Sequence, residues 1–206
     1  MSSSDVSDIS AGRERILDVA VSVLETRGEA ALRIAEVAEA ANVALGLISY
    51  HFGGRDGLIV AAQQRRFAGL VRDDGAAMKR VLDKATTYPD LMASLGDMTY
   101  ALLDSRRDQI RMSRIAAIAS TFGRDDAYDI TGAIVDQLLN DYTELIAGAQ
   151  RDGLVRTDLD ARAIATFIQS YALGLVIHDL DPSATDDAQL HQVIMTAVGA
   201  ILQPAT

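Results

Sequence analysis

The chain has 206 residues, of which 49% are hydrophobic and 23% are charged, so it can bury a core and is not expected to be disordered. It has no cysteine, which excludes disulfides, thiolate metal sites and cysteine nucleophiles. The formal net charge of −10 argues against diffuse attraction to nucleic acid or to an anionic membrane. Any contact with nucleic acid must therefore be local and depend on a few placed groups.

Segments 1–10 and 188–206 bear on localisation. The first is rich in Ser and Asp and has neither a basic flank nor an apolar run, so we expect a short flexible tail and no signal peptide. The second has no charged residue, but its apolar residues recur at helical spacing among polar ones, which favours a packed helix over a membrane span. The expected location is the cytoplasm, with no membrane partner.

Helical periodicity runs through nearly the whole chain, whereas alternating strand patterns are absent. In chain order, the pattern predicts helices over 11–27, 33–41 and 44–51, one starting at a cap on Asp56, and then 90–103, 107–121, 128–151, 159–178 and 186–202. Asp158 or Asp160 can cap the helix that starts near 159, and Asp181-Pro182 ends it. The sequence therefore predicts an all-α protein of about nine helices.

The most informative segment is 33–52, which reads as a helix-turn-helix. Ala38 is small where two helices must cross closely, and Asn42 is one of the few non-glycine residues that tolerate the left-handed conformation of a turn. Apolar residues that can fix the angle between the two helices are Ile34, Val37, Val43 and Ile48. Such a motif presents its second helix to the major groove of DNA.

These residues make the chain resemble the TetR-type transcriptional regulators. The resemblance rests on Ile16-Leu17, Ala20, Gly28, Leu32, Val37-Ala38, Val43, Gly46, Ile48, Tyr50-His51-Phe52, Arg55 and Leu58. It is close over about residues 11–70, and beyond them the chain matches only in helicity and length.

The resemblance implies three regions: a tail over 1–10, a three-helix DNA-binding domain over 11–57, and a larger helical domain over 58–206 for ligand binding and dimerisation. It also implies a homodimeric repressor that binds a palindromic operator in double-stranded DNA and is released by a small-molecule effector. No enzymatic activity, cofactor or metal is expected.

The DNA-binding residues that the resemblance implies lie in and around the second helix of the motif. They are Arg33, Ala44, Leu45, Leu47, Ser49, Tyr50, His51 and Arg55. His51 and Arg55 match positions that commonly contact phosphate. Over residues 13–56 the charges are five Arg against seven acids, a net of −2, so base recognition would depend on Arg33, Tyr50, Ser49 and apolar contact with thymine methyl groups.

A dimer surface is expected on the last two helices, where apolar residues recur at three and four positions. They are Ile164, Ile168, Tyr171, Leu175, Leu190, Ile194, Ala197 and Ile201. Two such helices from each subunit would form a four-helix bundle around a two-fold axis. Part of this stripe can instead close the core of the single chain.

The effector pocket is expected among the helices between about 60 and 178. Candidate lining residues are Tyr100, Met112, Arg114, Phe122, Asn140, Tyr142, Thr143, Gln169 and Tyr171. Because the chain has no Trp and few other aromatic residues, an aromatic cage for a quaternary cation is not favoured. An apolar or weakly polar metabolite fits the composition better.

Two other functions compete with this one. Residues 125–129 spell DDxxD, which holds magnesium in helical isoprenoid synthases, although acids at this place more simply favour a helix N-terminus. A magnesium-dependent helical enzyme is therefore one alternative. A helical adaptor that does not bind DNA is the other.

Overall fold

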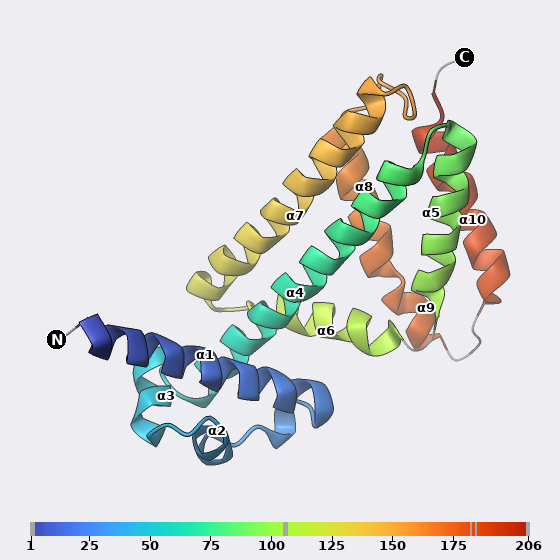
Figure 1. Ribbon diagram of the computed structural model, residues 1–206. Helices are drawn as coiled ribbons and strands as arrows, with labels where there is room; N and C mark the ends of the chain where they lie inside the picture. The colour runs from blue at the N-terminus through green and yellow to red at the C-terminus, as the bar shows by residue number, and fades with distance from the viewer. Residues whose placement is uncertain (1–2, 105–106, 182, 184, 205–206) are drawn as a thin grey trace. The chain divides into compact units, whose positions relative to one another are not determined.

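The computed structural model describes residues 3–104, 107–181, 183 and 185–204, and every regular element among them is helical, as predicted (Figure 1). The elements are α1 (Ser3–Thr26), the 3-10 helix η1 (Glu29–Ala31), α2 (Ile34–Ala40), α3 (Leu45–Phe52), α4 (Arg55–Lys84), α5 (Tyr88–Leu103), α6 (Asp108–Ala119), α7 (Asp125–Arg151), α8 (Ala161–Gly174), α9 (Val176–Leu180) and α10 (Asp187–Leu202). Pro182, which we expected to end a helix, lies outside the described residues.

Contacts divide the chain into two compact units. The N-terminal unit comprises Met1–Gly69 and Ala116–Thr131, and the C-terminal unit comprises Leu70–Ile115 and Gly132–Thr206. The division falls inside α4, α6 and α7 rather than at a loop, and so differs from the boundary at 57–58 drawn from the sequence. No change of composition marks it, because each of these helices continues through it.

The N-terminal unit has one apolar core, built by α1, α2, α3 and the start of α4. Its buried residues are Ile16, Leu17, Ala20, Leu24, Leu32, Val37, Ala38, Ala41, Ile48, Leu58, Ile59 and Ala62. They include Val37 and Ile48, two of the apolar residues predicted to fix the angle between the helices of the motif, and Ala38, the small residue predicted at the helix crossing. Burial of these side chains is the main force that holds α2 and α3 in place, because helices this short are marginal in isolation.

Several helix starts differ from the prediction. Helix α1 begins at Ser3 and not at Ala11, since Ser and Asp, which we assigned to a tail, also favour the first turn of a helix. Helix α4 begins at Arg55, so Asp56 lies in the first turn and is not the cap. Helix α5 begins at Tyr88, ahead of the predicted start at 90.

The start of α5 has a local explanation. The Asp90 backbone N–H donates to Thr87 Oγ1 at 3.3 Å, and the Thr87 backbone N–H donates to Asp90 Oδ2 at 3.0 Å, which is a capping box. Pro89 lies within the first two positions of the helix, where its missing N–H costs nothing. Pro89, which lies just before the predicted start at 90, is therefore part of the helix.

The predicted helix over 159–178 is in two pieces. Asp160 caps α8 by accepting a hydrogen bond from the Ala163 backbone N–H at 2.8 Å, which confirms one of the two predicted caps. Helix α8 ends at Gly174, and after Leu175 the separate helix α9 follows. Glycine weakens helix continuation at that point.

In the C-terminal unit, α5 and α10 pack side by side (Figure 1). Tyr88 Oη donates to the Gly199 carbonyl oxygen at 3.1 Å, and His191 Nε2 lies 2.9 Å from the Gly96 carbonyl oxygen. Asp186 caps α10 by accepting from the Ala188 and Gln189 backbone N–H groups. Buried apolar residues of this unit include Leu91, Leu95, Leu103, Leu138, Ile146, Val155, Val198 and Leu202.

Candidate nucleic-acid interface and effector cavity

Helices α2 and α3 form the predicted helix-turn-helix. Asn42 in the turn has a φ of 52°, the only positive φ at a non-glycine residue among those described. The Val43 backbone N–H donates to the Ala38 carbonyl oxygen at 3.0 Å, which closes the turn onto the end of α2. Helix α3 ends at Gly53, whose φ of 70° and ψ of 2° lie in the left-handed region that glycine adopts without steric cost.

One face of α3 is exposed and carries no charged side chain. Tyr50 is 72% exposed and Leu45 is 48% exposed, and Ala44, Gly46 and Ser49 beside them are also exposed. Ile48, on the opposite face, is fully buried in the core. The helix therefore leaves a tyrosine hydroxyl, a serine hydroxyl and several apolar groups unpacked by the rest of its own unit.

Leu47 does not belong to this exposed face. It is half-buried against the core of the N-terminal unit, and its Cδ2 lies 2.9 Å from the place that a Cβ would occupy on Gly12 of α1. Gly12 thus allows α1 and α3 to approach each other closely. Leu47 is a packing residue, contrary to its assignment as a DNA contact, because its position on the helix turns it toward α1.

His51 is half-buried between aromatic neighbours. Its ring centroid lies 5.0 Å from that of Tyr50 in an edge-on arrangement and 5.9 Å from that of Phe52. Its Nε2 is buried and has no hydrogen-bond partner. A phosphate contact through this nitrogen would require the ring to turn, and the contact predicted for His51 stays a prediction.

Arg33 and Arg55 both bind backbone carbonyl groups around η1. Arg33 donates to the Ala30 carbonyl oxygen at 2.6 Å, whereas Arg55 donates to the carbonyl oxygens of Leu32 at 3.0 Å and Glu29 at 2.8 Å. The Ala30 and Leu32 carbonyl groups lie at the end of η1, where helical partners run out, and the Glu29 carbonyl oxygen also accepts from the Leu32 backbone N–H at 3.1 Å. Arg33 is exposed, but Arg55 is engaged in holding η1 to the start of α4.

Two arginines of α4 offset the excess of acidic residues over 13–56. Arg65 pairs with Glu14 at 2.5 Å and with Asp18 at 2.9 Å, and Arg66 pairs with Glu25 at 3.6 Å. With these two arginines, residues 13–66 carry seven Arg and seven acids, a net charge of 0 instead of −2. Glu14, Asp18 and Glu25 of α1 are thus paired inside the unit.

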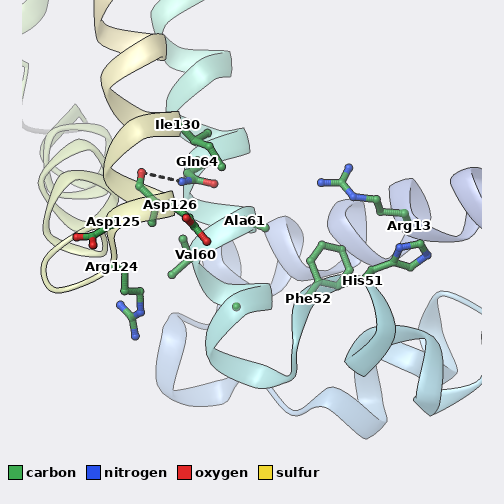
Figure 2. A pocket seen from close by; sticks show the side chains of 12 residues that line it. Arg13, His51, Phe52, Val60, Ala61, Gln64, Arg124, Asp125, Asp126 and Ile130 are labelled. Carbon is green, nitrogen blue, oxygen red and sulfur yellow. Dashed lines mark hydrogen bonds between the residues drawn. The ribbon is translucent and has the colours of Figure 1, made fainter.

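A groove of about 610 Å³ lies within the N-terminal unit, and no sequence pattern predicted it. Figure 2 shows Arg13, His51 and Phe52 toward one end, and Arg124, Asp125 and Asp126 toward the other. Arg13 lies over the Phe52 ring, 5.5 Å from its centroid.

Gln64 lies at the back of this groove. It is buried, and its Nε2 donates to the Ala127 carbonyl oxygen at 3.1 Å (Figure 2). A polar residue on the apolar stripe of a helix was the one available sequence signal for this contact.

The start of α4 requires glycine at position 57. A Cβ there would lie 1.8 Å from the Phe52 carbonyl oxygen, far inside any real contact. The tight passage from α3 into α4 therefore depends on a residue without a side chain.

A smaller, more enclosed cavity of about 190 Å³ lies in the C-terminal unit. Four predicted pocket residues, Arg114, Tyr142, Gln169 and Tyr171, line it. Its other polar lining residues, which were not predicted from the sequence, are Asp73, Asp74, Arg80 and Arg107. Asp74 had a signal, because it falls on the apolar stripe of Phe67, Val71 and Met78.

Burial is the main influence on the ionisation of three side chains that line this cavity. Burial raises the pKa of Asp74, against the opposing effect of the Arg114 guanidinium that pairs with it. Burial also raises the pKa of the Tyr142 and Tyr171 hydroxyls. Both tyrosines therefore stay protonated at neutral pH and keep an O–H that can donate.

The other five predicted pocket residues lie elsewhere. Phe122 is 91% exposed in the N-terminal unit, and Met112 is 45% exposed. Tyr100 lies in an open groove beside His191 of α10. Asn140 is exposed and binds Asp136 and Arg162, and Thr143 donates to the Leu139 carbonyl oxygen of its own helix.

The predicted dimer stripe is divided by burial. Ile164, Ile168 and Leu175 are buried within the single chain, and Tyr171 lines the cavity, so these side chains of α8 close the protein's own core. On α10, Leu190, Ile194 and Ile201 are half-buried and Ala197 is exposed. The large apolar side chains left exposed on α8, α9 and α10 are Phe167, Ile177, Leu180 and Val193.

Residues 125–129 begin α7, where Asp125 and Asp126 occupy the first turn. No group of three His, Asp or Glu side chains among the described residues could hold a metal ion. One described stretch, Ala161–Leu180, is long and apolar enough to cross a bilayer by length and composition. It is interrupted after Gly174 and contributes Ile164, Ala165 and Ile168 to the buried core.

A helix-turn-helix with an exposed second helix, joined to a larger helical unit with an internal cavity, defines a class of DNA-binding transcriptional regulators. Residues 16–62 match the family described as bacterial regulatory proteins, tetR family. Over residues 16–62 the chain therefore carries the DNA-binding domain of this family, which confirms the resemblance inferred from its residues.

Two curated transcriptional regulators of the helix-turn-helix type are similar to part of the chain. The chain is 46% identical over 54 residues to an HTH-type transcriptional regulator in the dhlA 5′ region of Xanthobacter autotrophicus, over 26% of this chain and 27% of that protein. It is 34% identical over 68 residues to the HTH-type transcriptional regulator BetI of Brucella canis, over 33% and 34% of the two chains. These matches thus span about a third of those relatives or less.

A bacterial regulatory protein of the tetR family from Rhodococcus RHA1 has the same fold. It superposes with a TM-score of 0.57 over 95% of this chain and 98% of its own, at 17% identity.

Proposed function

We propose that this protein is a homodimeric transcriptional repressor that binds a palindromic operator through α3 and is released by a small molecule bound in the C-terminal unit. It acts on DNA in the cytoplasm. The observation that carries the proposal is the exposed face of α3, where Leu45 and Tyr50 project from a helix whose opposite face is buried.

The chemistry of this face suits base recognition in the major groove. Leu45 and Ala44 can contact thymine methyl groups, and the hydroxyls of Ser49 and Tyr50 can exchange hydrogen bonds with base edges or phosphates. Arg33 is exposed beside α2 and can add a guanidinium contact. With α3 itself uncharged, we expect few phosphate contacts.

The short length of α3 favours a dimer. One eight-residue helix covers only a few base pairs, whereas two related by a two-fold axis reach half-sites about 34–36 Å apart. The exposed apolar side chains Phe167, Ile177, Leu180 and Val193 supply a surface whose burial would favour association. We therefore propose that these four exposed side chains, and not the buried residues of α8, form the dimer interface.

The cavity of the C-terminal unit supports an effector site. It is enclosed by residues of α4, α5, α6, α7 and α8, and it holds both ionic and hydroxyl groups. A ligand that prefers the conformation unable to bind DNA would release the operator, and operator DNA would then weaken ligand binding by the same factor.

Selection of bound fragments from the source genome, followed by fluorescence anisotropy across a salt series, tests the DNA-binding part. We expect a two-fold symmetric site bound by two chains, with log Kd changing by about 0.9 per log unit of salt for each phosphate contact. Transcription in vitro from that site should fall when the protein is added. Failure to select any site at low salt would contradict the proposal.

A further inference from the structure

The 190 Å³ cavity of the C-terminal unit has an excess of positive charge. Its ionic lining residues are Arg80, Arg107 and Arg114 against Asp73 and Asp74, which gives 3 − 2 = +1. Any protonation of Asp74, whose pKa is raised by burial, increases this excess. A cavity of this kind disfavours a cationic ligand and favours an anionic one.

Arg114 supplies an unused donor in this cavity. One end of its guanidinium, Nη2, pairs with Asp74 Oδ2, while its Nε is buried and has no hydrogen-bond partner. A buried N–H of a charged group without an acceptor costs free energy, and such groups are rare in folded proteins. An acceptor supplied by a ligand would remove this cost.

The remaining lining fits a small organic body. Met98, Leu102 and Ile168 provide apolar wall, and Tyr142, Tyr171 and Gln169 provide further donors. A cavity of about 150 Å³ holds a benzene ring, so 190 Å³ accommodates one ring or a short chain with a single polar group. A larger effector would require the wall to move.

We propose that the effector is a small monocarboxylic acid bound as its anion, with its carboxylate accepting from Arg114 Nε–H and its apolar part against Met98, Leu102 and Ile168. This inference rests on the proposed function only in treating the cavity as the effector site. It replaces the apolar or weakly polar metabolite expected from composition, because that expectation did not include the charged residues that α4 brings into the cavity.

Titration calorimetry on the full chain tests the ligand class without DNA. The probes are benzoate and butanoate, each compared with its neutral amide, benzamide or butanamide. We expect at least one carboxylate to bind about tenfold or more tightly than its amide. If neither carboxylate binds more tightly than its amide, the proposal is wrong.

Two variants place the binding in this cavity. Arg114→Lys keeps the charge that faces Asp74 but removes Nε–H, and it should weaken the carboxylate about tenfold while leaving the amide unchanged. Arg162→Lys is the matched control, because Arg162 pairs with Asp136 on the exposed surface of the same unit, and it should have no effect. Unchanged carboxylate binding in a folded Arg114→Lys protein would overturn the assignment.

A variant that fills the cavity covers the case in which Arg114→Lys fails to fold. Ala172→Leu adds bulk to the wall and keeps every charge, and it should abolish carboxylate binding. Binding that survives it would place the ligand elsewhere and refute the proposal.

Anisotropy with operator DNA separates the two proposals. A carboxylate that binds through Arg114 but leaves DNA affinity unchanged supports the ligand class and contradicts effector release.

Discussion

Arg55 donates from Nε to the carbonyl oxygen of Leu32 at 3.0 Å, which joins the first residue of α4 to the residue that ends η1. The same guanidinium reaches the Glu29 carbonyl oxygen at 2.8 Å. The family resemblance implied a phosphate contact for Arg55, but the structure shows a positioning role within the N-terminal unit. Its two hydrogen bonds hold η1 to the start of α4.

Replacing Arg55 should therefore lower stability before it alters DNA chemistry. We expect Arg55→Ala to reduce the free energy of unfolding by about 1–2 kcal/mol, measured by urea denaturation, because two carbonyl groups lose a charged donor that is itself partly exposed. Arg55→Lys should recover only part of this loss, since a single ammonium cannot reproduce the planar fork. Arg124→Ala, which removes an exposed arginine of the same unit, is the control. Wild-type stability with lost operator binding would instead support a phosphate contact.

Tyr50 offers a sharper test of the DNA surface. Tyr50→Ala should weaken operator binding by about tenfold or more, because it removes the largest side chain on the exposed face of α3. Circular dichroism and urea denaturation should show no change, since the side chain contributes little to the core. Tyr128→Ala removes another tyrosine of the same unit, 68% exposed on α7, and should leave operator affinity unchanged. Equal losses in the two variants would show that the effect is not specific to α3.

The proposed dimer surface can be tested by adding charge. Ile177 is 71% exposed on α9, and Ile177→Glu together with Val193→Glu should give a monomer in sedimentation velocity at concentrations where the wild type is a dimer. Ile130→Glu, at an isoleucine 51% exposed on α7, should leave the dimer intact. A dimer that survives the double change would place the interface on another surface.

Alkaline pH should destabilise the C-terminal unit through Tyr142. Burial raises the pKa of this hydroxyl, so the folded state holds its proton more tightly than the unfolded chain does. Stability is therefore undiminished below the unfolded pKa of about 10 and falls as the pH rises from there toward the folded pKa. In Tyr142→Phe, part of this loss of stability should disappear. The part of the tyrosinate absorbance that develops at the highest pH should disappear with it. An unaltered absorbance titration would contradict a buried, protonated Tyr142.

The sequence predicted the features that depend on local patterns. Helical periodicity gave the all-α class, and Ala38, Asn42 and Ile48 identified the helix-turn-helix, since each of these residues acts on neighbours close in the chain. The core of the N-terminal unit was predicted for the same reason. Helix ends were less accurate where capping partners decided them, as at Thr87.

Features that depend on the pairing of distant helices were predicted less well. Ile164 and Ile168 form a stripe that suits either a partner chain or the protein's own core, and periodicity alone does not distinguish the two. The charged lining of the cavity comes from α4 and α6, which are far apart in sequence, and was largely missed. Arg114 was the one charged residue of this lining among the predicted pocket residues.

Gly46 lies in the middle of α3 with no neighbouring atom within 4 Å of the place of a Cβ, and α3 has only eight residues. Glycine in a helix interior costs about 1 kcal/mol relative to alanine, and so short a segment is not stable as a helix alone. A peptide of residues 44–53 should therefore be unstructured in water. The smallest segment that can hold α3 as a helix is therefore the whole packed core around it. A designed chimera must transfer that core intact.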